Sequence, residues 1–141
     1  MRKPKILLVD DEERFLSTTQ KVLRRKGYDV LTAGSGAEAL VTLDRNPVDV
    51  AIVDVKMPGM DGIATLKEIK RRHPLVEVIM LTGHGTFESA VEGMKSGATD
   101  YLTKPSEIDE LLEKVAEAFE RRRRLEEKIR TIQNHQTPQE K

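Results

Sequence analysis

Four short apolar runs in this chain are each followed at once by a residue that can take part in chemistry. Aspartates follow residues 6–9 and 48–53, a threonine follows residues 79–81, and a lysine-proline pair follows residues 100–103. If the runs are parallel strands of one sheet, their carboxyl ends meet at one edge. The residues brought to that edge are Asp10, Asp11, Asp54, Thr82 and Lys104. Three carboxylates, a hydroxyl and an ammonium group suit a magnesium-bound phosphoryl group on an aspartate.

The size and charge of the chain limit its class. At 141 residues it has the length of one domain, and such a domain buries about 68% of the surface that its unfolded chain exposes. Lysine plus arginine and aspartate plus glutamate both total 24. The overall charge therefore gives no electrostatic reason to expect binding to nucleic acid or to an anionic membrane.

Cysteine is absent from the sequence. This excludes a disulfide framework and a thiolate zinc site, and it makes a reducing cytoplasm the natural setting. The apolar run before Asp10 is too short for a signal peptide or a membrane span. We therefore expect a soluble cytoplasmic protein.

The short apolar runs alternate with longer amphipathic stretches, which is the pattern of βα units. We expect strands at residues 6–9, 29–33, 48–53, 76–81 and 100–103, with a helix after each. Ser35 and Ser106 each precede an acidic residue by three positions, a spacing typical of a helix start. The pattern predicts an α/β fold whose parallel sheet is covered on both faces, with Asp49 as the one discordant residue in a buried strand.

Four segments together resemble the receiver domain of two-component response regulators, of the kind found in the NtrC-like and FixJ-like regulators. They are the paired acids Asp10-Asp11, the segment 54–62 (DVKMPGMDG), the Leu81-Thr82-Gly83 step and residues 101–105 (YLTKP). The resemblance covers about residues 4 to 120. It implies a flavodoxin-like (βα)5 three-layer sandwich with strand order 2-1-3-4-5, the order that is known for a receiver protein.

The resemblance also assigns roles to the acidic residues. A carboxylate can attack phosphorus and hold the group as an acyl phosphate, and Asp54 matches the phospho-acceptor of the family. Adjacent carboxylates resist ionisation unless a cation is present, and Mg²⁺, for which Mn²⁺ can substitute, would resolve this. By the family pattern Asp11 and Asp54 bind the metal directly, Asp10 binds it through water, and Lys56 contributes its backbone carbonyl.

The remaining residues of the pattern concern charge and switching. Lys104 supplies a positive charge that we expect to pair with Asp54 before phosphorylation and with the phosphoryl oxygens afterwards. The family uses a cis peptide before Pro105 to orient this lysine. Thr82 is expected to bond a phosphoryl oxygen, and Tyr101 is expected to turn inward when Thr82 moves.

The function implied is a switch that takes a phosphoryl group from the histidine of a sensor kinase and controls an output domain or partner, in transcription regulation. Such a domain catalyses only its own phosphorylation and dephosphorylation, and it binds neither nucleic acid nor membrane directly. One alternative is an aspartate-nucleophile phosphohydrolase, but these enzymes have a second aspartate where this chain has Lys56. Another is a pseudo-receiver that only binds partners, against which the intact acidic set argues.

The sequence divides into a receiver domain at residues 1–120 and an extension at residues 121–141. Heptad positions from Ile108 to Ile132 predict that the last helix extends into a short coiled coil that forms a homodimer, with an isolated, fraying helix as the alternative. Arg122 is the one charged break in this seam. The arginine run 121–124 predicts a solvated helix face, with a partner or nucleic-acid contact as the alternative. Residues 134–141 are expected to be disordered or to begin a linker.

Overall fold

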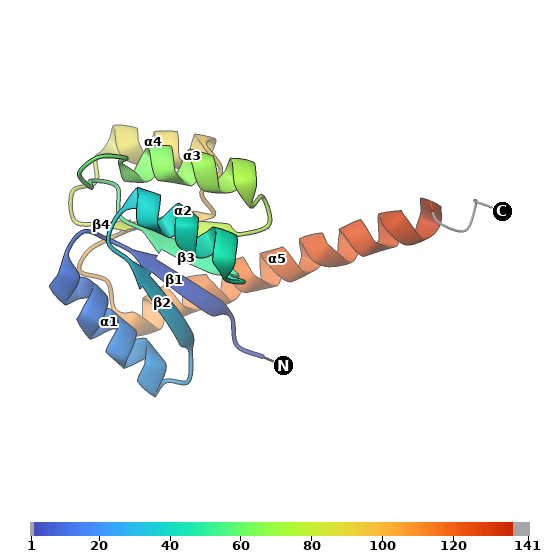
Figure 1. Cartoon of the computed structure of the whole chain (residues 1–141), viewed down its shortest axis with the longest axis horizontal. Helices are drawn as coiled ribbons and strands as arrows, with labels where there is room; N and C mark the ends of the chain where they lie inside the picture. The colour runs from blue at the N-terminus through green and yellow to red at the C-terminus, as the bar shows by residue number, and fades with distance from the viewer. Residues whose placement is uncertain (1, 137–141) are drawn as a thin grey trace.

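The computed structural model describes residues 2–136. Five strands form one parallel sheet in the order β2-β1-β3-β4-β5, and a helix follows each strand (Figure 1). The strands are β1 (Lys5–Val9), β2 (Asp29–Ala33), β3 (Val50–Val53), β4 (Glu77–Thr82) and β5 (Asp100–Thr103). The helices are α1 (Glu13–Arg25), α2 (Gly36–Arg45), α3 (Gly62–Arg72), α4 (Phe87–Lys95) and α5 (Ile108–Gln136). The predicted fold class and strand order are confirmed.

Alternate residues of each strand face opposite layers of helices. On β1, Leu7 and Val9 belong to one apolar cluster, which includes Leu40 of α2 and Leu66 of α3. The intervening residues of β1 belong to a second cluster, formed with α1 and the first half of α5. Helices α2, α3 and α4 therefore cover one face of the sheet, and α1 and α5 cover the other (Figure 1). Burial on both faces explains why the central strands are almost wholly apolar.

Three of the predicted strands have different boundaries in the structure, since β1 begins at Lys5, β3 begins at Val50 and β4 runs from Glu77 to Thr82. The third strand begins at Val50 rather than at residue 48, and the Val48 carbonyl accepts a hydrogen bond from Arg122 on α5 (2.6 Å). The fourth strand includes Thr82, which we had placed just after it, because Thr82 pairs with Thr103 of β5. Thr82 is thus held by the sheet itself.

The helix starts also refine the prediction. Ser35 caps α2 by accepting a hydrogen bond from the backbone N–H of Glu38 (3.1 Å), as its spacing predicted. The predicted cap at Ser106 is wrong, because α5 begins at Ile108 and the Ser106 hydroxyl lies 3.4 Å from the Glu110 side chain instead. An exposed serine next to a longer acidic side chain has this alternative partner, which a three-residue spacing does not reveal.

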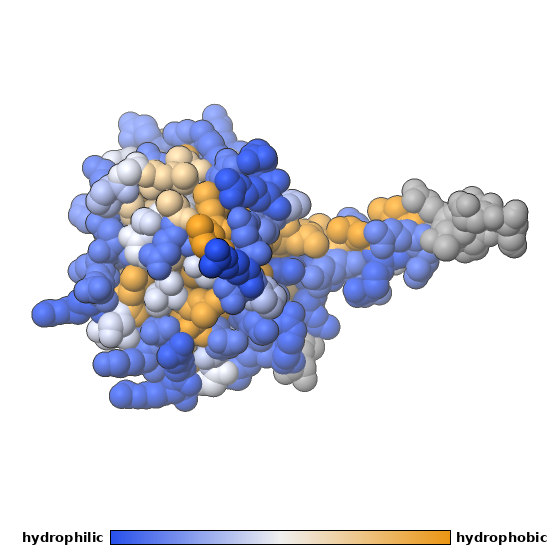
Figure 2. Space-filling view, viewed as in Figure 1, coloured by the Kyte–Doolittle hydropathy of each residue, from blue (hydrophilic) through white to orange (hydrophobic). Residues whose placement is uncertain are grey.

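Helix α5 runs for 29 residues and projects well beyond the sheet (Figure 1). Its first half is buried, so three positions of the predicted coiled-coil seam, Leu111, Val115 and Ala118, contact the domain's own core. We call residues 121–136 the stalk. Exposed apolar residues continue along it, with Ile129 exposed by 41% and Ile132 by 53% (Figure 2). Only this part of the seam is accessible. The prediction of disorder or a linker from residue 134 is wrong for residues 134–136, which belong to α5, and the rest of that predicted segment lies outside the described residues.

A charged cluster lies at the amino edge of the sheet, opposite the edge at which Asp10, Asp54 and Lys104 follow the strands. Asp49 is 3% exposed, and it accepts hydrogen bonds from the Arg2 guanidinium (2.7 Å) and from the Lys5 backbone N–H (2.8 Å). Arg122 Nη1 lies 3.6 Å from the same carboxylate. Asp49, discordant in an apolar strand, and Arg122, discordant in an apolar seam, therefore compensate each other. Within residues 2–136 no helix is long and apolar enough to cross a membrane.

Candidate functional site

Three carboxylates gather where β1 and β3 end. Asp10 and Asp11 follow β1, and Asp54 follows β3, and one carboxylate oxygen of each lies within 4.8 Å of the others. Asp10 and Asp54 are buried, whereas Asp11 is exposed. The arrangement combines fixed charges with one that solvent can reach, which suits a hard cation that keeps several of its waters.

Asp10 is held in place by its neighbours. Its Oδ1 atom accepts a hydrogen bond from the Glu12 backbone N–H (2.9 Å), and its Oδ2 atom accepts one from Lys104 Nζ (2.6 Å). Burial raises the pKa of Asp10 above its usual value, and the charge of Asp54 acts in the same direction, although Lys104 opposes both. Burial and the repulsion between Asp10 and Asp54 therefore disfavour the ionised carboxylates, and binding of a further cation would stabilise them.

Lys104 contacts Asp10, and not Asp54 as we expected. Its ammonium also lies 3.6 Å from Glu12 and 4.1 Å from the centre of the Phe15 ring, so α1 draws it toward the β1 side of the site. Burial would lower the pKa of Lys104, but the hydrogen bond to Asp10 and the nearby acidic charges outweigh burial and raise it. The lysine is therefore charged. The peptide bond between Lys104 and Pro105 is cis, as the family pattern implied.

Asp54 has the least satisfied side chain of the site. It is 3% exposed, and its Oδ1 atom is buried without a hydrogen-bond partner among residues 2–136. An unpaired buried carboxylate oxygen is costly. Because a metal ion or a phosphoryl group would satisfy such an atom, the residues present fit a magnesium site.

Gly62 is a site residue that the sequence showed only as a turn former. A methyl group there would overlap the backbone carbonyl of Asp54, and the Gly62 N–H donates to the carbonyl of Val55 (2.7 Å). Helix α3 thus begins directly against the backbone of Asp54, and only glycine permits this approach.

The Thr82 hydroxyl lies at the end of β4 and is fully buried. It accepts a hydrogen bond from the His84 backbone N–H (3.1 Å). A methyl group at Gly85 would overlap the Tyr101 hydroxyl and would lie 3.1 Å from the Thr82 methyl carbon. Thr82 and Tyr101, the two predicted switch residues, therefore both lie close to the same glycine. Ser89 of α4, which the sequence did not reveal, lies 2.7 Å from the Tyr101 hydroxyl.

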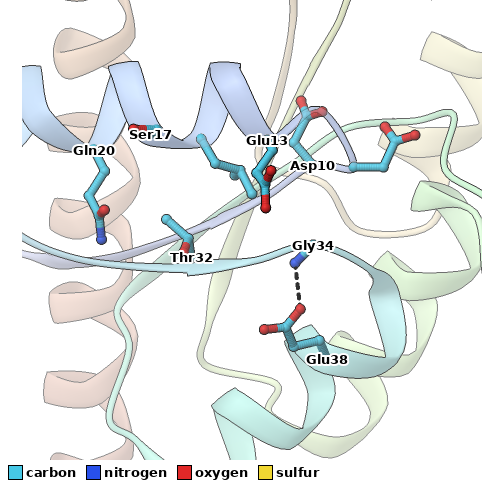
Figure 3. A pocket seen from close by; sticks show the side chains of 9 residues that line it. Asp10, Glu13, Ser17, Gln20, Thr32, Gly34 and Glu38 are labelled. Carbon is cyan, nitrogen blue, oxygen red and sulfur yellow. Dashed lines mark hydrogen bonds between the residues drawn. The ribbon is translucent and has the colours of Figure 1, made fainter.

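Two hollows open beside Asp11. One, of about 510 Å³, is lined by Lys56, Asp61 and His84 together with Asp11, which places the predicted carbonyl ligand residue Lys56 beside the acidic cluster. The other, of about 530 Å³, runs between α1, β2 and α2. Figure 3 shows Asp10 and Glu13 at one end of it and Gln20 at the other, with the Glu38 carboxylate bonded to the Gly34 N–H (2.7 Å) on the opposite wall. The acidic cluster is thus accessible from two sides.

Longer proteins share this sequence in part. The chain is 45% identical over 106 residues to the transcriptional regulatory protein ZraR of Escherichia coli (strain K12), a match that covers 75% of this chain and 24% of ZraR. It is 40% identical over 119 residues to the DNA-binding transcriptional regulator NtrC of the same strain, which covers 84% of this chain and 25% of NtrC. The chain therefore spans about a quarter of the length of these curated relatives.

Solved structures share the fold. A CheY-like response regulator receiver domain protein from Methanospirillum hungatei JF-1 superposes with a TM-score of 0.83 at 31% identity, covering 87% of this chain and 98% of that one. NtrX from Brucella abortus gives 0.82 at 31% identity, covering 93% and 30%. A response regulator from Burkholderia pseudomallei, solved with a phosphorylated aspartic acid, calcium ion and citrate, gives 0.76 at 28% identity, covering 80% and 66%.

The family comparison agrees with the geometry of the acidic edge. Residues 6–116 match the family described as the response regulator receiver domain. This range begins within β1 and ends within α5, so it contains all of β1 except Lys5, the other four strands and every residue of the site. The chain belongs to the response regulator receiver domain family and is the receiver domain of a response regulator.

Proposed function

We propose that Asp54 accepts a phosphoryl group in a reaction that requires Mg²⁺. The observation that carries this proposal is the buried, unpartnered Oδ1 atom of Asp54 beside two further carboxylates. Support also comes from the relative from Burkholderia pseudomallei, whose structure contains a phosphorylated aspartic acid. A carboxylate oxygen that has no hydrogen-bond partner among residues 2–136 is available to form a bond to phosphorus.

The bond changes balance without an added oxidant or reductant. A carboxylate oxygen of Asp54 attacks the phosphorus of a phosphohistidine, an oxygen–phosphorus bond forms, and the nitrogen–phosphorus bond breaks as the imidazole leaves with its electron pair and takes up a proton. The product is an acyl phosphate. Water later attacks this phosphorus, which releases phosphate and restores the carboxylate.

The proposed metal ligands are the carboxylates of Asp11 and Asp54, the carboxylate of Asp10 through water, and the backbone carbonyl of Lys56. When bound, Mg²⁺ (or Mn²⁺ in its place) supplies charge that offsets the charge on the phosphoryl oxygens. Lys104 adds a second positive charge on the β1 side. The Asp10–Lys104 contact holds that charge ready at the site.

The output of the reaction is a change of shape. Thr82 would exchange its contact with the His84 N–H for one with a phosphoryl oxygen, and this would draw in the loop that leads to α4. Tyr101 lies against the same loop and would follow it. The result is a two-state switch of α4, β5 and α5, with no substrate other than the domain's own aspartate.

The proposed partners follow from the relatives, which are transcriptional regulators. A sensor histidine kinase in the cytoplasm would supply the phosphoryl group, and an output domain or separate partner would read the switch. Neither nucleic acid nor membrane is a proposed ligand of the receiver itself. The stalk is proposed to form a homodimer contact through Leu125, Ile129 and Ile132. Sedimentation of the full chain against the double variant Ile129→Gln/Ile132→Gln tests this, and equal monomer masses at all concentrations would refute it.

The phosphorylation proposal is tested by intact-protein mass spectrometry after incubation with phosphoramidate and Mg²⁺. We expect one acid-labile phosphoryl group on the wild type and on the control variant Asp44→Asn, and none on Asp54→Asn or on wild type incubated with a chelator. Wild type that stays unmodified would refute the switch and favour a pseudo-receiver. Continuous phosphate release from outside esters, without retention of the group, would favour the phosphohydrolase.

A further inference from the structure

Ser89 joins the first turn of α4 to the Tyr101 side chain. Its hydroxyl oxygen lies 2.9 Å from the Thr86 backbone nitrogen, 3.0 Å from the Thr86 carbonyl oxygen and 2.7 Å from the Tyr101 hydroxyl. The Ser89 backbone N–H in turn donates to the Thr86 hydroxyl (3.0 Å), which completes a capping box at the start of α4.

The Ser89 hydroxyl has one proton and two lone pairs, so it can serve several partners at once. It accepts a hydrogen bond from the Thr86 N–H, which can only donate. Either hydroxyl can donate in the Ser89–Tyr101 hydrogen bond, because the Thr86 carbonyl also accepts from the Ala90 N–H (3.0 Å). In both arrangements Ser89 links the start of α4 to the Tyr101 hydroxyl.

Helix α4 has few other attachments. The only one of its residues that is buried is Gly93, where an added methyl group would lie 3.6 Å from both Ile63 and the Tyr101 ring. Phe87 is exposed by 81% and Met94 by 48%. An element with so little buried apolar surface opens at low cost in free energy. The Ser89–Tyr101 hydrogen bond is therefore a substantial part of what holds the first turn of α4 to β5.

We propose that Ser89 is a positioning residue that holds Tyr101 in the orientation of this structure and transmits movement of the Thr82 loop to it. The capping box fixes Ser89 to Thr86, and three residues separate Thr86 from Thr82. A shift of the loop moves the capping box, and the capping box contains the hydrogen-bond partner of the Tyr101 hydroxyl. The signalling role of this coupling rests on the proposed function, because phosphorylation of Asp54 is the event that would move Thr82. The hydrogen bond itself does not depend on phosphorylation.

Fluorine NMR of protein labelled with 3-fluorotyrosine tests the role of Ser89. The chain has two tyrosines, so Tyr101→Phe assigns both signals and Tyr28 serves as an internal reference. In unphosphorylated Ser89→Ala we expect the Tyr101 signal to move or broaden while the Tyr28 signal stays in place. Ser89→Thr keeps the hydroxyl and should restore the wild-type signal. A Tyr101 signal that is the same in Ser89→Ala as in wild type would overturn the proposal.

A second measurement avoids disturbing the capping box. Tyr101→Phe removes only the tyrosine hydroxyl, so amide hydrogen exchange within α4 should become roughly two- to tenfold faster, the change that corresponds to the net contribution of one hydrogen bond. Exchange in α2 should not change. Unaltered exchange in α4 would contradict the role of Ser89. Because both measurements use unphosphorylated protein, their failure is distinguishable from a failure of Asp54 to accept the phosphoryl group.

Discussion

Lys104 donates from its Nζ atom to the Oδ2 atom of Asp10 at 2.6 Å, and not to the proposed acceptor Asp54. The contact keeps a positive charge at the site while leaving the Oδ1 atom of Asp54 without a partner among residues 2–136. The lysine therefore need not leave the acceptor before a phosphoryl group can approach.

Replacing Lys104 tests this arrangement. We expect Lys104→Met to slow uptake of the phosphoryl group from phosphoramidate by about 10²-fold, the lower end of what removal of one preorganised donor costs. Lys128→Met on the exposed stalk is the matched control and should leave the rate unchanged. The rates are measured by intact mass against time. Equal rates for Lys104→Met and wild type would show that the lysine has no part in the reaction.

The close contact at Gly62 can be tested by comparing the same glycine-to-alanine substitution at Gly62 and at Gly83. A methyl group at Gly62 would overlap the Asp54 carbonyl, whereas one at Gly83 would meet only the Lys104 side chain at 3.8 Å, an ordinary contact. We expect Gly62→Ala to lower the free energy of unfolding by about 1–3 kcal/mol or more, because the backbone cannot give way easily. Gly83→Ala should have little effect. Urea denaturation of both variants measures the difference, and equal stabilities would be evidence against the close approach of α3 to Asp54.

Asp49 predicts a specific dependence of stability on pH. Burial disfavours its charged form, but hydrogen bonds from Arg2 and from the Lys5 N–H outweigh burial and hold the pKa of Asp49 below its usual value. A carboxyl group whose pKa is lower in the folded state stabilises the fold above its unfolded pKa of about 3.9. That contribution is lost as the pH falls through the lower folded value.

We therefore expect Asp49→Asn to destabilise the domain at neutral pH by about 1.5–3 kcal/mol, the range for hydrogen bonds to a charged group. The gap between wild type and variant should narrow as the pH falls below about 4. Thermal unfolding at a series of pH values measures it. Asp29→Asn, which changes an exposed aspartate at the start of β2, should show no such gap, and a gap for Asp49→Asn that widened in acid would contradict the sign of the pKa shift.

Arg122 is expected to fix the direction in which the stalk leaves the domain. Its guanidinium donates to the Val48 carbonyl, and it lies near Asp49 and near Glu126 of its own helix. Because the chain has no cysteine, two spin labels can be placed at introduced cysteines, one on α1 and one on the stalk. Arg122→Met should broaden the distance distribution between them, whereas Arg124→Met, at an exposed position, should not. Equal widths would show that the core contacts of α5 suffice.

Much of the fold follows from local sequence patterns. A strand that is buried on both faces must be apolar, and a helix that covers the sheet must have apolar residues at helical spacing. The boundaries predicted for β2 and β5 are those observed, and the acidic cluster followed from where the strands end. The contacts between particular side chains could not be predicted from these local patterns. Asp49 and Arg122 were each recognised as discordant, yet they lie 73 positions apart in the sequence, and no local period relates residues at such a distance. Lys104 likewise has a long flexible side chain, whose partner is set by α1 and not by its own strand.

Trapping of the acyl phosphate tests the central claim most directly. Borohydride reduces an aspartyl phosphate to homoserine and leaves free aspartate unchanged, so peptide mapping after phosphorylation and reduction locates the modified residue. We predict homoserine at position 54 in wild type, in an amount that depends on Mg²⁺, and none at Asp10, Asp11 or Asp61. Homoserine at one of those other positions, with Asp54 unmodified, would contradict the assignment of Asp54 as the acceptor.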